Sequence, residues 1–190
     1  MDLLLGIFSA FGLSASAGLN AYIPLLVVAL LGRYTGWITL SEPWNALESW
    51  WVIGALLILS AIEFFADKIP AVNHVNDAIQ TFVRPAAGAI AFAASANVVT
   101  DASPVFSLIL GLLVAGGVHA AKSVVVRPAV TAATGGAGNI PVSILEDVVA
   151  AGVSILAVMI PVLVAAIVIL FTAWVIWFLW RRASRKAARG

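Results

Sequence analysis

Ionisable side chains gather in one stretch of an otherwise apolar chain, residues 117–147. They comprise a histidine, two cations and two carboxylates, at His119, Lys122, Arg127, Glu146 and Asp147. Because charged groups are costly inside a bilayer, those that occur there usually face the interior of a helix bundle or a water-filled cavity. We therefore expect a functional site in this stretch, with a cavity beside it.

The backbone of the same stretch is expected to depart from a regular helix. Pro128 lacks a backbone N–H and disturbs any helix that contains it. Gly135, Gly136 and Gly138 follow, and their conformational freedom is typical of a hinge. Irregular backbone at membrane depth is tolerated only where protein or water covers it.

The charged residues are candidates for two kinds of binding. Lys122 and Arg127 could receive an anionic group, helped by backbone donors at a helix start near Asn139. Alternatively, both could neutralise carboxylates on other helices or extend to the cytoplasmic interface. Asp147 is the better candidate for a proton or cation, because helix capping already accounts for Glu146. The remaining candidates are Asn20 and His119 for solute binding, and Glu63 and Asp67 for proton or ion coupling.

Other site chemistries lack their sequence patterns. The chain has two histidines and no compact set of His, Asp and Glu, so no metal site is predicted. A glycine-rich run occurs, but no Lys-Ser/Thr follows it, and no G-x-S-x-G motif is present. Without cysteine there is no thiol nucleophile. We expect neither a cofactor nor a recognisable catalytic set.

Composition indicates an integral membrane protein. Of 190 residues, 63% are hydrophobic and 10% charged, with a mean hydropathy of +1.10, whereas soluble domains average about 25% charged. At about 20 residues per span, this length predicts one all-α polytopic membrane domain, residues 1–190, with five or six transmembrane helices. The number depends on whether residues 148–180 form one kinked helix or two helices divided at Pro161.

The first apolar region, residues 3–31, has a small and partly polar centre at Ser14–Asn20. This string is typical either of close helix packing or of an interrupted helix with Asn20 facing a cavity. Asn45–Glu48 has the form of a capping box and predicts the start of a second span. Arg84–Pro85 predicts the start of a third, because proline suits a first helical turn.

A second capping box, Ser143–Glu146, suggests an internal repeat. It follows Asn45–Glu48 at a separation similar to that between Gly12–Pro24 and Gly117–Pro128. We expect two half-repeats, residues 1–104 and 105–180, followed by a basic tail, 181–190. Inverted repeats with broken or re-entrant helices are common in transporters.

Positive residues favour one orientation. Six spans with both ends in the cytoplasm place Lys68, Arg84, Lys122 and Arg127 on the side of the basic tail. The expected partners are membrane lipids and a small-molecule solute, not nucleic acid, and association into a homo-oligomer is left open.

Two blocks, residues 66–90 and 122–148, resemble the signature segments of an uncharacterised family of small bacterial integral membrane proteins, a domain of unknown function. They read ADKIPAVNHVNDAIQTFVRPAAGAI and KSVVVRPAVTAATGGAGNIPVSILEDV. The resemblance covers nearly the whole chain. It implies a multi-pass protein of the bacterial inner (cytoplasmic) membrane, and no activity, substrate or catalytic residue.

The leading hypothesis is a transporter or channel-like permease for a small, anionic or lipid-derived solute. Pairing of Lys122, Arg127 and Asp147 inside a bundle without a water-accessible cavity would remove its physical basis. The alternative is a non-transporting scaffold or assembly partner, suggested by the small-residue faces of the first and third spans. An intramembrane enzyme ranks third.

Overall fold

The computed structural model describes residues 2–95 and 103–187, and all regular secondary structure in these ranges is helical, which confirms the all-α fold there. The helices are α1 (Asp2–Leu19), α2 (Tyr22–Tyr34), the 3-10 helix η1 (Trp44–Glu48), α3 (Trp50–Ala66), α4 (Pro70–Ser95), α5 (Pro104–Ala121), the π-helix η3 (Lys122–Val126), α6 (Arg127–Thr134), α7 (Asn139–Met159) and α8 (Pro161–Ala187).

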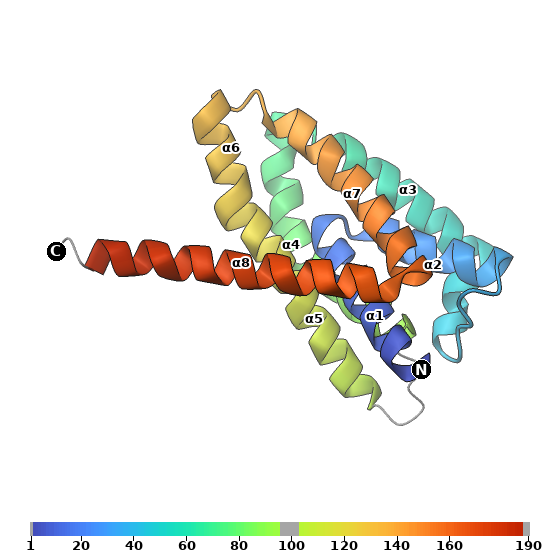
Figure 1. The fold of residues 1–190 in the computed structure, drawn as a ribbon. Helices are drawn as coiled ribbons and strands as arrows, with labels where there is room; N and C mark the ends of the chain where they lie inside the picture. The colour runs from blue at the N-terminus through green and yellow to red at the C-terminus, as the bar shows by residue number, and fades with distance from the viewer. Residues whose placement is uncertain (1, 96–102, 188–190) are drawn as a thin grey trace.

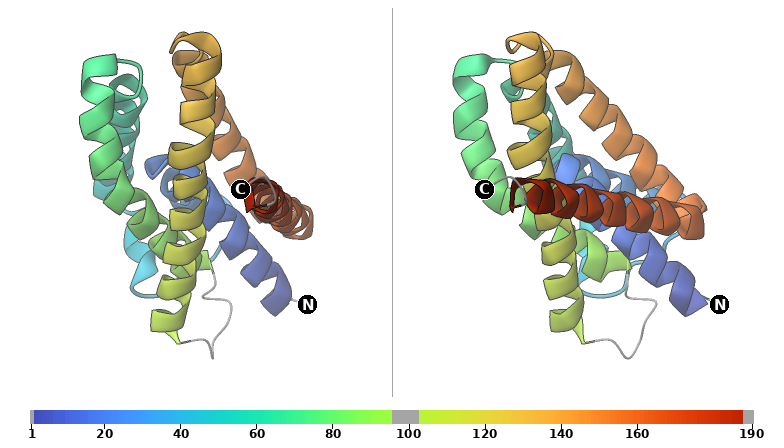
Figure 2. Two further views of the ribbon diagram at one scale, coloured as in Figure 1. Left: turned by 90° about the vertical axis from the view of Figure 1, so that its left-hand side faces the viewer. Right: turned by 60° about the vertical axis from the view of Figure 1, so that its left-hand side comes forward.

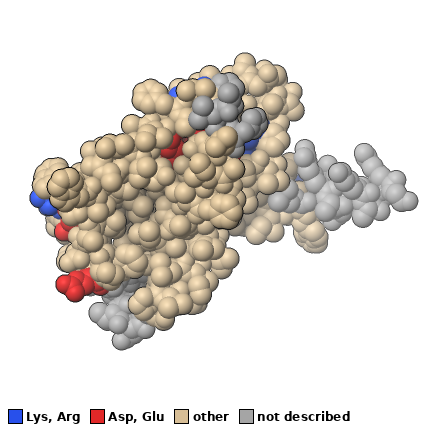
Figure 3. Space-filling view, turned by 180° about the vertical axis from the view of Figure 1, so that it is seen from behind, with Lys and Arg blue, Asp and Glu red and all other residues tan. Residues whose placement is uncertain are grey.

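Two helical stretches, Pro104–Thr134 and Asn139–Met159, are long and apolar enough to cross a membrane. On the face in Figure 3 few of the described atoms belong to Lys, Arg, Asp or Glu. Large apolar side chains such as Phe82 and Val124 are exposed, while Glu63 and Arg84 are buried. This distribution is the one expected of a helix bundle surrounded by lipid.

Helix α1 packs against α4, α5, α7 and α8. Its contact with α4 and α5 depends on small residues: a Cβ added at Gly18 would lie 2.5 Å from the Ala115 carbonyl oxygen, and Ser14 Oγ donates to the Gly111 carbonyl at 2.8 Å. The close packing expected for Ser14–Asn20 is present, and the helix is also interrupted, between Leu19 and Tyr22. The cavity expected beside Asn20 stays a prediction.

The expected helix start at Arg84–Pro85 is wrong, because α4 continues through both residues. Contacts to neighbouring helices on both sides of the proline hold this helix in place. Arg84 pairs with Glu63 on α3, and Gly88 packs against Ala115 on α5.

Both predicted capping boxes are also wrong. Residues 44–48 form η1, and α3 is capped by Ser49, whose Oγ accepts from the Val52 N–H at 3.3 Å. Ser143 and Glu146 lie inside α7, where their side chains have partners on other helices. The repeat loses the support of these two boxes, and the division into half-repeats stays a prediction.

Two helices, not one, follow the glycines. α7 ends at Met159, Ile160 departs from helical geometry with φ −137° and ψ 64°, and Pro161 begins α8. Toward its C-terminal end, α8 extends away from the other helices (Figures 1 and 2). This settles the helix boundary at Pro161, while the number of spans stays a prediction.

Candidate functional site

The interruption between α1 and α2 is stabilised by side chains. Asn20 Oδ1 accepts from the N–H groups of Tyr22 and Ile23 at 3.1 and 3.0 Å, so Asn20 caps α2. Its Nδ2 donates to Asp147 Oδ1 at 2.9 Å. At the end of α1, the Leu19 carbonyl accepts from Lys122 Nζ at 3.0 Å.

A second irregularity lies beside the first, at the π-helix Lys122–Val126. The expected departure from a regular helix is thus confirmed, but α5, η3 and α6 form one continuous rod (Figure 2). Pro128 lies in the first turn of α6, where its missing N–H is tolerated. Such π-segments are frequent at functional sites. Here Lys122 is the first residue of the π-helix and Arg127 directly follows it.

Ion pairs join five helical segments at these irregularities. Glu63 and Arg84 approach to 2.8 Å with both side chains fully buried, and Lys122 approaches Glu146 to 2.8 Å. Arg127 Nη2 contacts both Asp67 and Glu146, at 3.4 and 3.1 Å. We call the interacting residues the charged cluster: Glu63, Asp67, Lys68, Arg84, Lys122, Arg127, Glu146 and Asp147.

Neutral polar groups complete the charged cluster. Asp67 accepts from Asn76 Nδ2 at 2.6 Å and from Ser143 Oγ at 3.2 Å. Arg84 Nη1 lies 3.2 Å from His119 Nδ1. Because arginine is only a donor, this Nδ1 must be the acceptor, which makes His119 neutral with its proton on Nε2, 3.3 Å from Thr81 Oγ1. Four carboxylates and four cations therefore balance.

Most of the candidate site residues meet here, but largely as partners of one another. Lys122 is bonded to Glu146 and the Leu19 carbonyl, and Asp147 to Asn20 and, at 3.3 Å, to Lys68. The alternative that the cations neutralise carboxylates on other helices is therefore the arrangement observed. Arg127 differs: it is 8% exposed, and its Nε and Nη1 have no hydrogen-bond partner among the residues that the structure describes.

Some candidates lie apart from the charged cluster. Asn139 Nδ2 donates to Thr131 Oγ1 at 3.0 Å, in an exposed position at the start of α7. Gly135 and Gly136, with φ 62° and 94°, form the turn between α6 and α7 in conformations that favour glycine. Gly138 packs against Thr134. Movement at this turn stays a prediction.

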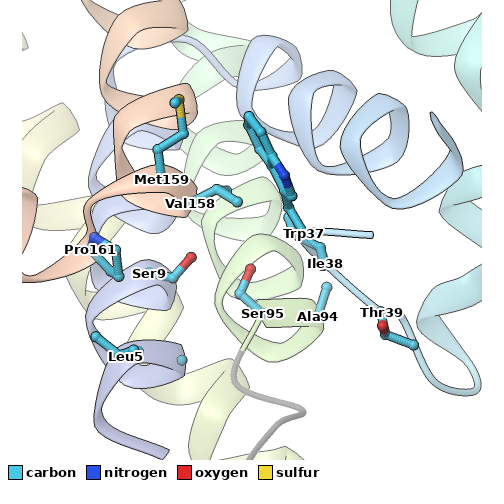
Figure 4. Close-up of a pocket in the computed structure, with 11 residues that line it drawn as sticks. Leu5, Ser9, Trp37, Ile38, Thr39, Ala94, Ser95, Val158, Met159 and Pro161 are labelled. Atoms are coloured by element: carbon cyan, nitrogen blue, oxygen red, sulfur yellow. The ribbon is translucent and has the colours of Figure 1, made fainter. Parts of the chain in front are cut away.

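The cavity shown in Figure 4 is not at the predicted place. It lies near the N-terminal half of α1, and none of the candidate site residues lines it. The charged cluster sits around the other end of the same helix, at Asn20.

Sequence reasoning assigned no site role to Arg84, Asn76 and Lys68, and it gave Glu146 a role in helix capping alone. For Arg84 the sequence did contain a signal, the spacing of polar residues in α4. Asn76, Gln80 and Arg84 are four residues apart, and all three are buried. Large apolar side chains between them, such as Phe82, are exposed instead. An inward polar face with an outward apolar face is the inverse of a soluble amphipathic helix. Helix α7 repeats the pattern, with Ser143, Glu146, Asp147, Ala150 and Ser154 buried.

Among known proteins, no curated protein and no solved structure matches this chain. The resemblance expected from the two sequence blocks is confirmed, while bacterial origin and a membrane location stay predictions. The chain belongs to the family described as Domain of unknown function (DUF4126), whose model matches residues 7–181.

Proposed function

We propose that the protein is a multi-pass membrane transporter or channel-like permease for a small, anionic or lipid-derived solute. Membership of the family carries no activity, so the proposal is argued from the residues. We place it in the bacterial inner membrane with five or six spans and a cytoplasmic C-terminus. The two long apolar helices, the apolar exterior and the buried charges support this setting. Ionisable residues inside a membrane bundle commonly mark solute or ion pathways.

The observation that carries the proposal is the incomplete pairing of Arg127. A guanidinium has five N–H donors and is always charged, yet Nε and Nη1 of this buried residue have no partner among the described residues. Leaving a buried donor unsatisfied costs about 1–3 kcal/mol, and more for a charged group. A carboxylate or phosphate oxygen of a solute would remove that cost.

The ion pairs of Lys122 and Asp147 limit which residues are free to contact a solute. Each is engaged by other members of the charged cluster in this state, which weakens the hypothesis that both bind solute directly. The pairing named in the condition for rejecting transport is thus present for all three residues, because Arg127 Nη2 also contacts Asp67 and Glu146. What distinguishes Arg127 is that its Nε and Nη1 have no hydrogen-bond partner among the described residues. We therefore assign anion contact to Arg127, with Asn20, His119 and Lys122 in supporting positions.

The charge balance of the cluster predicts that movement of an anion is coupled to movement of a proton or a cation. The charged cluster is neutral as it stands, and net charge is costly in a region of low dielectric constant. An entering anion would therefore be accompanied by a proton or a cation. The carboxylates Glu63, Asp67 and Asp147 are the proposed sites for that positive charge.

Flux into proteoliposomes tests this proposal. We expect purified protein to accelerate uptake of at least one labelled probe among acetate, inorganic phosphate and glycerol phosphate, with R127Q abolishing the uptake. The matched control is R181Q, since Arg181 is exposed and lies far along the chain on α8. Equal uptake by R127Q and the unmodified protein would contradict the assignment to Arg127.

A second candidate function, a non-transporting scaffold or assembly partner, is favoured by α8. This helix exposes large apolar side chains, including Trp174, Trp177 and Trp180. A photoreactive residue at position 177 would form a stoichiometric adduct with one membrane protein if α8 is a docking helix. A transporter would instead crosslink to lipid and retain flux.

A further inference from the structure

A cavity of about 490 Å³ lies between α1, the connection from α2 to η1, the end of α4 and the junction of α7 with α8 (Figure 4). Its size falls within the range of about 300–1,000 Å³ typical of ligand pockets. Ser9 and Asn20 are separated by about 16 Å along α1 at 1.5 Å per residue. The cavity is therefore distinct from the charged cluster, and a ligand bound in it requires no transport activity.

The described lining of the cavity offers no ion-pair partner to an ionised group. Among the described residues that line it, none is Asp, Glu, Lys, Arg or His, and most of the wall is apolar, with Leu5, Val158 and Met159 contributing. An ionised carboxylate or phosphate brought inside would lack a charged partner, which is costly. The chemistry of the walls suits a hydrocarbon chain.

Two of the three hydroxyl-bearing residues in the described lining, Ser9 and Ser95, give the cavity a polar spot. Ser9 on α1 and Ser95 at the end of α4 both direct their oxygens into it (Figure 4). Ser95 Oγ donates to the Ala91 carbonyl at 2.8 Å, which leaves its lone pairs to accept from a ligand hydroxyl. These groups suit an uncharged, oxygen-bearing head such as a glycerol ester.

Aromatic residues place the cavity near the expected membrane surface. Trp37 lines it while remaining 59% exposed, at the same end of the bundle as the exposed Tyr34 and Trp50, whose rings lie 6.2 Å apart. Trp and Tyr are enriched at membrane–water interfaces, at the level of the lipid head groups. A lipid at this level would place its ester beside the hydroxyls and its chain along the apolar wall.

We propose that this cavity binds one acyl chain together with the uncharged ester that joins it to glycerol, with the ester or hydroxyl oxygens beside Ser9 and Ser95 and any charged head group outside the cavity. Two sources share that chemistry, a monoacylglycerol and one chain of a bilayer phospholipid. In either case the ligand is held by hydrocarbon contact and neutral hydrogen bonds.

Quenching of Trp37 fluorescence by brominated lipids tests the proposal in detergent micelles. The probes are dibromostearoyl monoglyceride, dibromostearoyl phosphatidylcholine and ionised dibromostearate. The contribution of Trp37 is the difference in quenching between the unmodified protein and W37F. We expect saturable quenching by the monoglyceride, with an apparent affinity about tenfold higher than that of dibromostearate. Quenching by the phosphatidylcholine as well identifies a bilayer lipid as the source, and its absence identifies a single-chain ester; both support the proposal.

Filling the cavity provides the matched comparison. S9L should weaken monoglyceride binding about tenfold, and T39F, in the exposed connection, does the same if S9L fails to fold. G54L adds similar bulk on α3, where a Cβ meets nothing within 4 Å, and should leave binding unchanged. Quenching that rises without saturation, or that is equal for monoglyceride and dibromostearate, or that is unaffected by a folded cavity-filling variant, overturns the proposal.

Discussion

The charged cluster and the small-residue contact between α4 and α5 hold helices together in opposite ways. At the contact, backbones approach so closely that a Cβ added at Gly111 would lie 2.5 Å from the Gly88 carbonyl oxygen. In the charged cluster the backbone is irregular, and long side chains span between helices. Within lipid, small-residue packing and interhelical hydrogen bonds are both recognised ways of joining helices.

The comparison bears on function. Close packing and the bond from Ser14 to the Gly111 carbonyl already join α1, α4 and α5 without any charge. Eight buried or partly buried charges are therefore not required to assemble these three helices. The charged cluster instead connects them to α3 and α7, which are the helices that would have to shift if its ion pairs exchanged partners during transport.

The largest effect is expected from breaking the most buried pair. R84M leaves the Glu63 carboxyl fully buried and without the guanidinium whose Nε and Nη2 both donate to its Oε1, and removing one partner of a buried pair costs about 3–5 kcal/mol. The double variant E63M/R84M should recover most of this stability, because an apolar pair of similar volume is often tolerated. Thermal unfolding in detergent, followed by circular dichroism, measures both. A single variant as stable as the double would show that the pair is not coupled.

A smaller loss is expected at the interruption of α1 and α2. N20A removes the cap of α2, worth about 1 kcal/mol, and the bond to Asp147, worth about 1.5–3 kcal/mol for a charged acceptor. N20S keeps a capping oxygen but is too short to reach Asp147, so it should lose only the second contribution. Equal unfolding temperatures for the two variants would show that capping contributes nothing here.

The sequence was sufficient to identify most members of the charged cluster but not to pair them. Glu63, Asp67 and Asp147 stand out because ionisable groups are rare in apolar helices. Their partners come from distant segments, as with Asn20 and Asp147, which are 127 positions apart. No local pattern encodes such contacts, so pairing required the fold.

Local patterns misled wherever a tertiary contact competed with them. Ser143–Glu146 satisfies the capping-box pattern, yet Ser143 donates to Asp67 and Glu146 pairs with Lys122. The four-residue spacing of buried polar groups on α4 and α7 was the better signal. It depends on recognising that apolar side chains face outward, the reverse of the rule for soluble helices.

A moderate effect is expected at the small-residue contact itself. G111A places a methyl group 2.5 Å from the Gly88 carbonyl oxygen and 2.7 Å from Ala89 Cα, both of them backbone atoms. Overpacking of this kind costs about 1–3 kcal/mol. G54A is the control, because its Cβ meets nothing within 4 Å, and alanine there should stabilise the helix by up to about 1 kcal/mol. Equal stabilities for the two variants would mean that close approach does not hold α4 to α5.

The smallest effect is expected at the start of α3, far from the charged cluster. There the observed N-cap, Ser49, can be compared with Asn45, the first residue of the predicted capping box. S49A removes the oxygen that accepts from the Val52 N–H, and losing an N-cap costs about 1 kcal/mol. N45A alters the residue that the capping-box pattern selected, but Asn45 lies in η1 and does not cap α3. Unfolding temperatures should therefore fall for S49A and stay unchanged for N45A. The reverse order would return the start of α3 to Asn45 and restore the support that the paired capping boxes lent to the internal repeat.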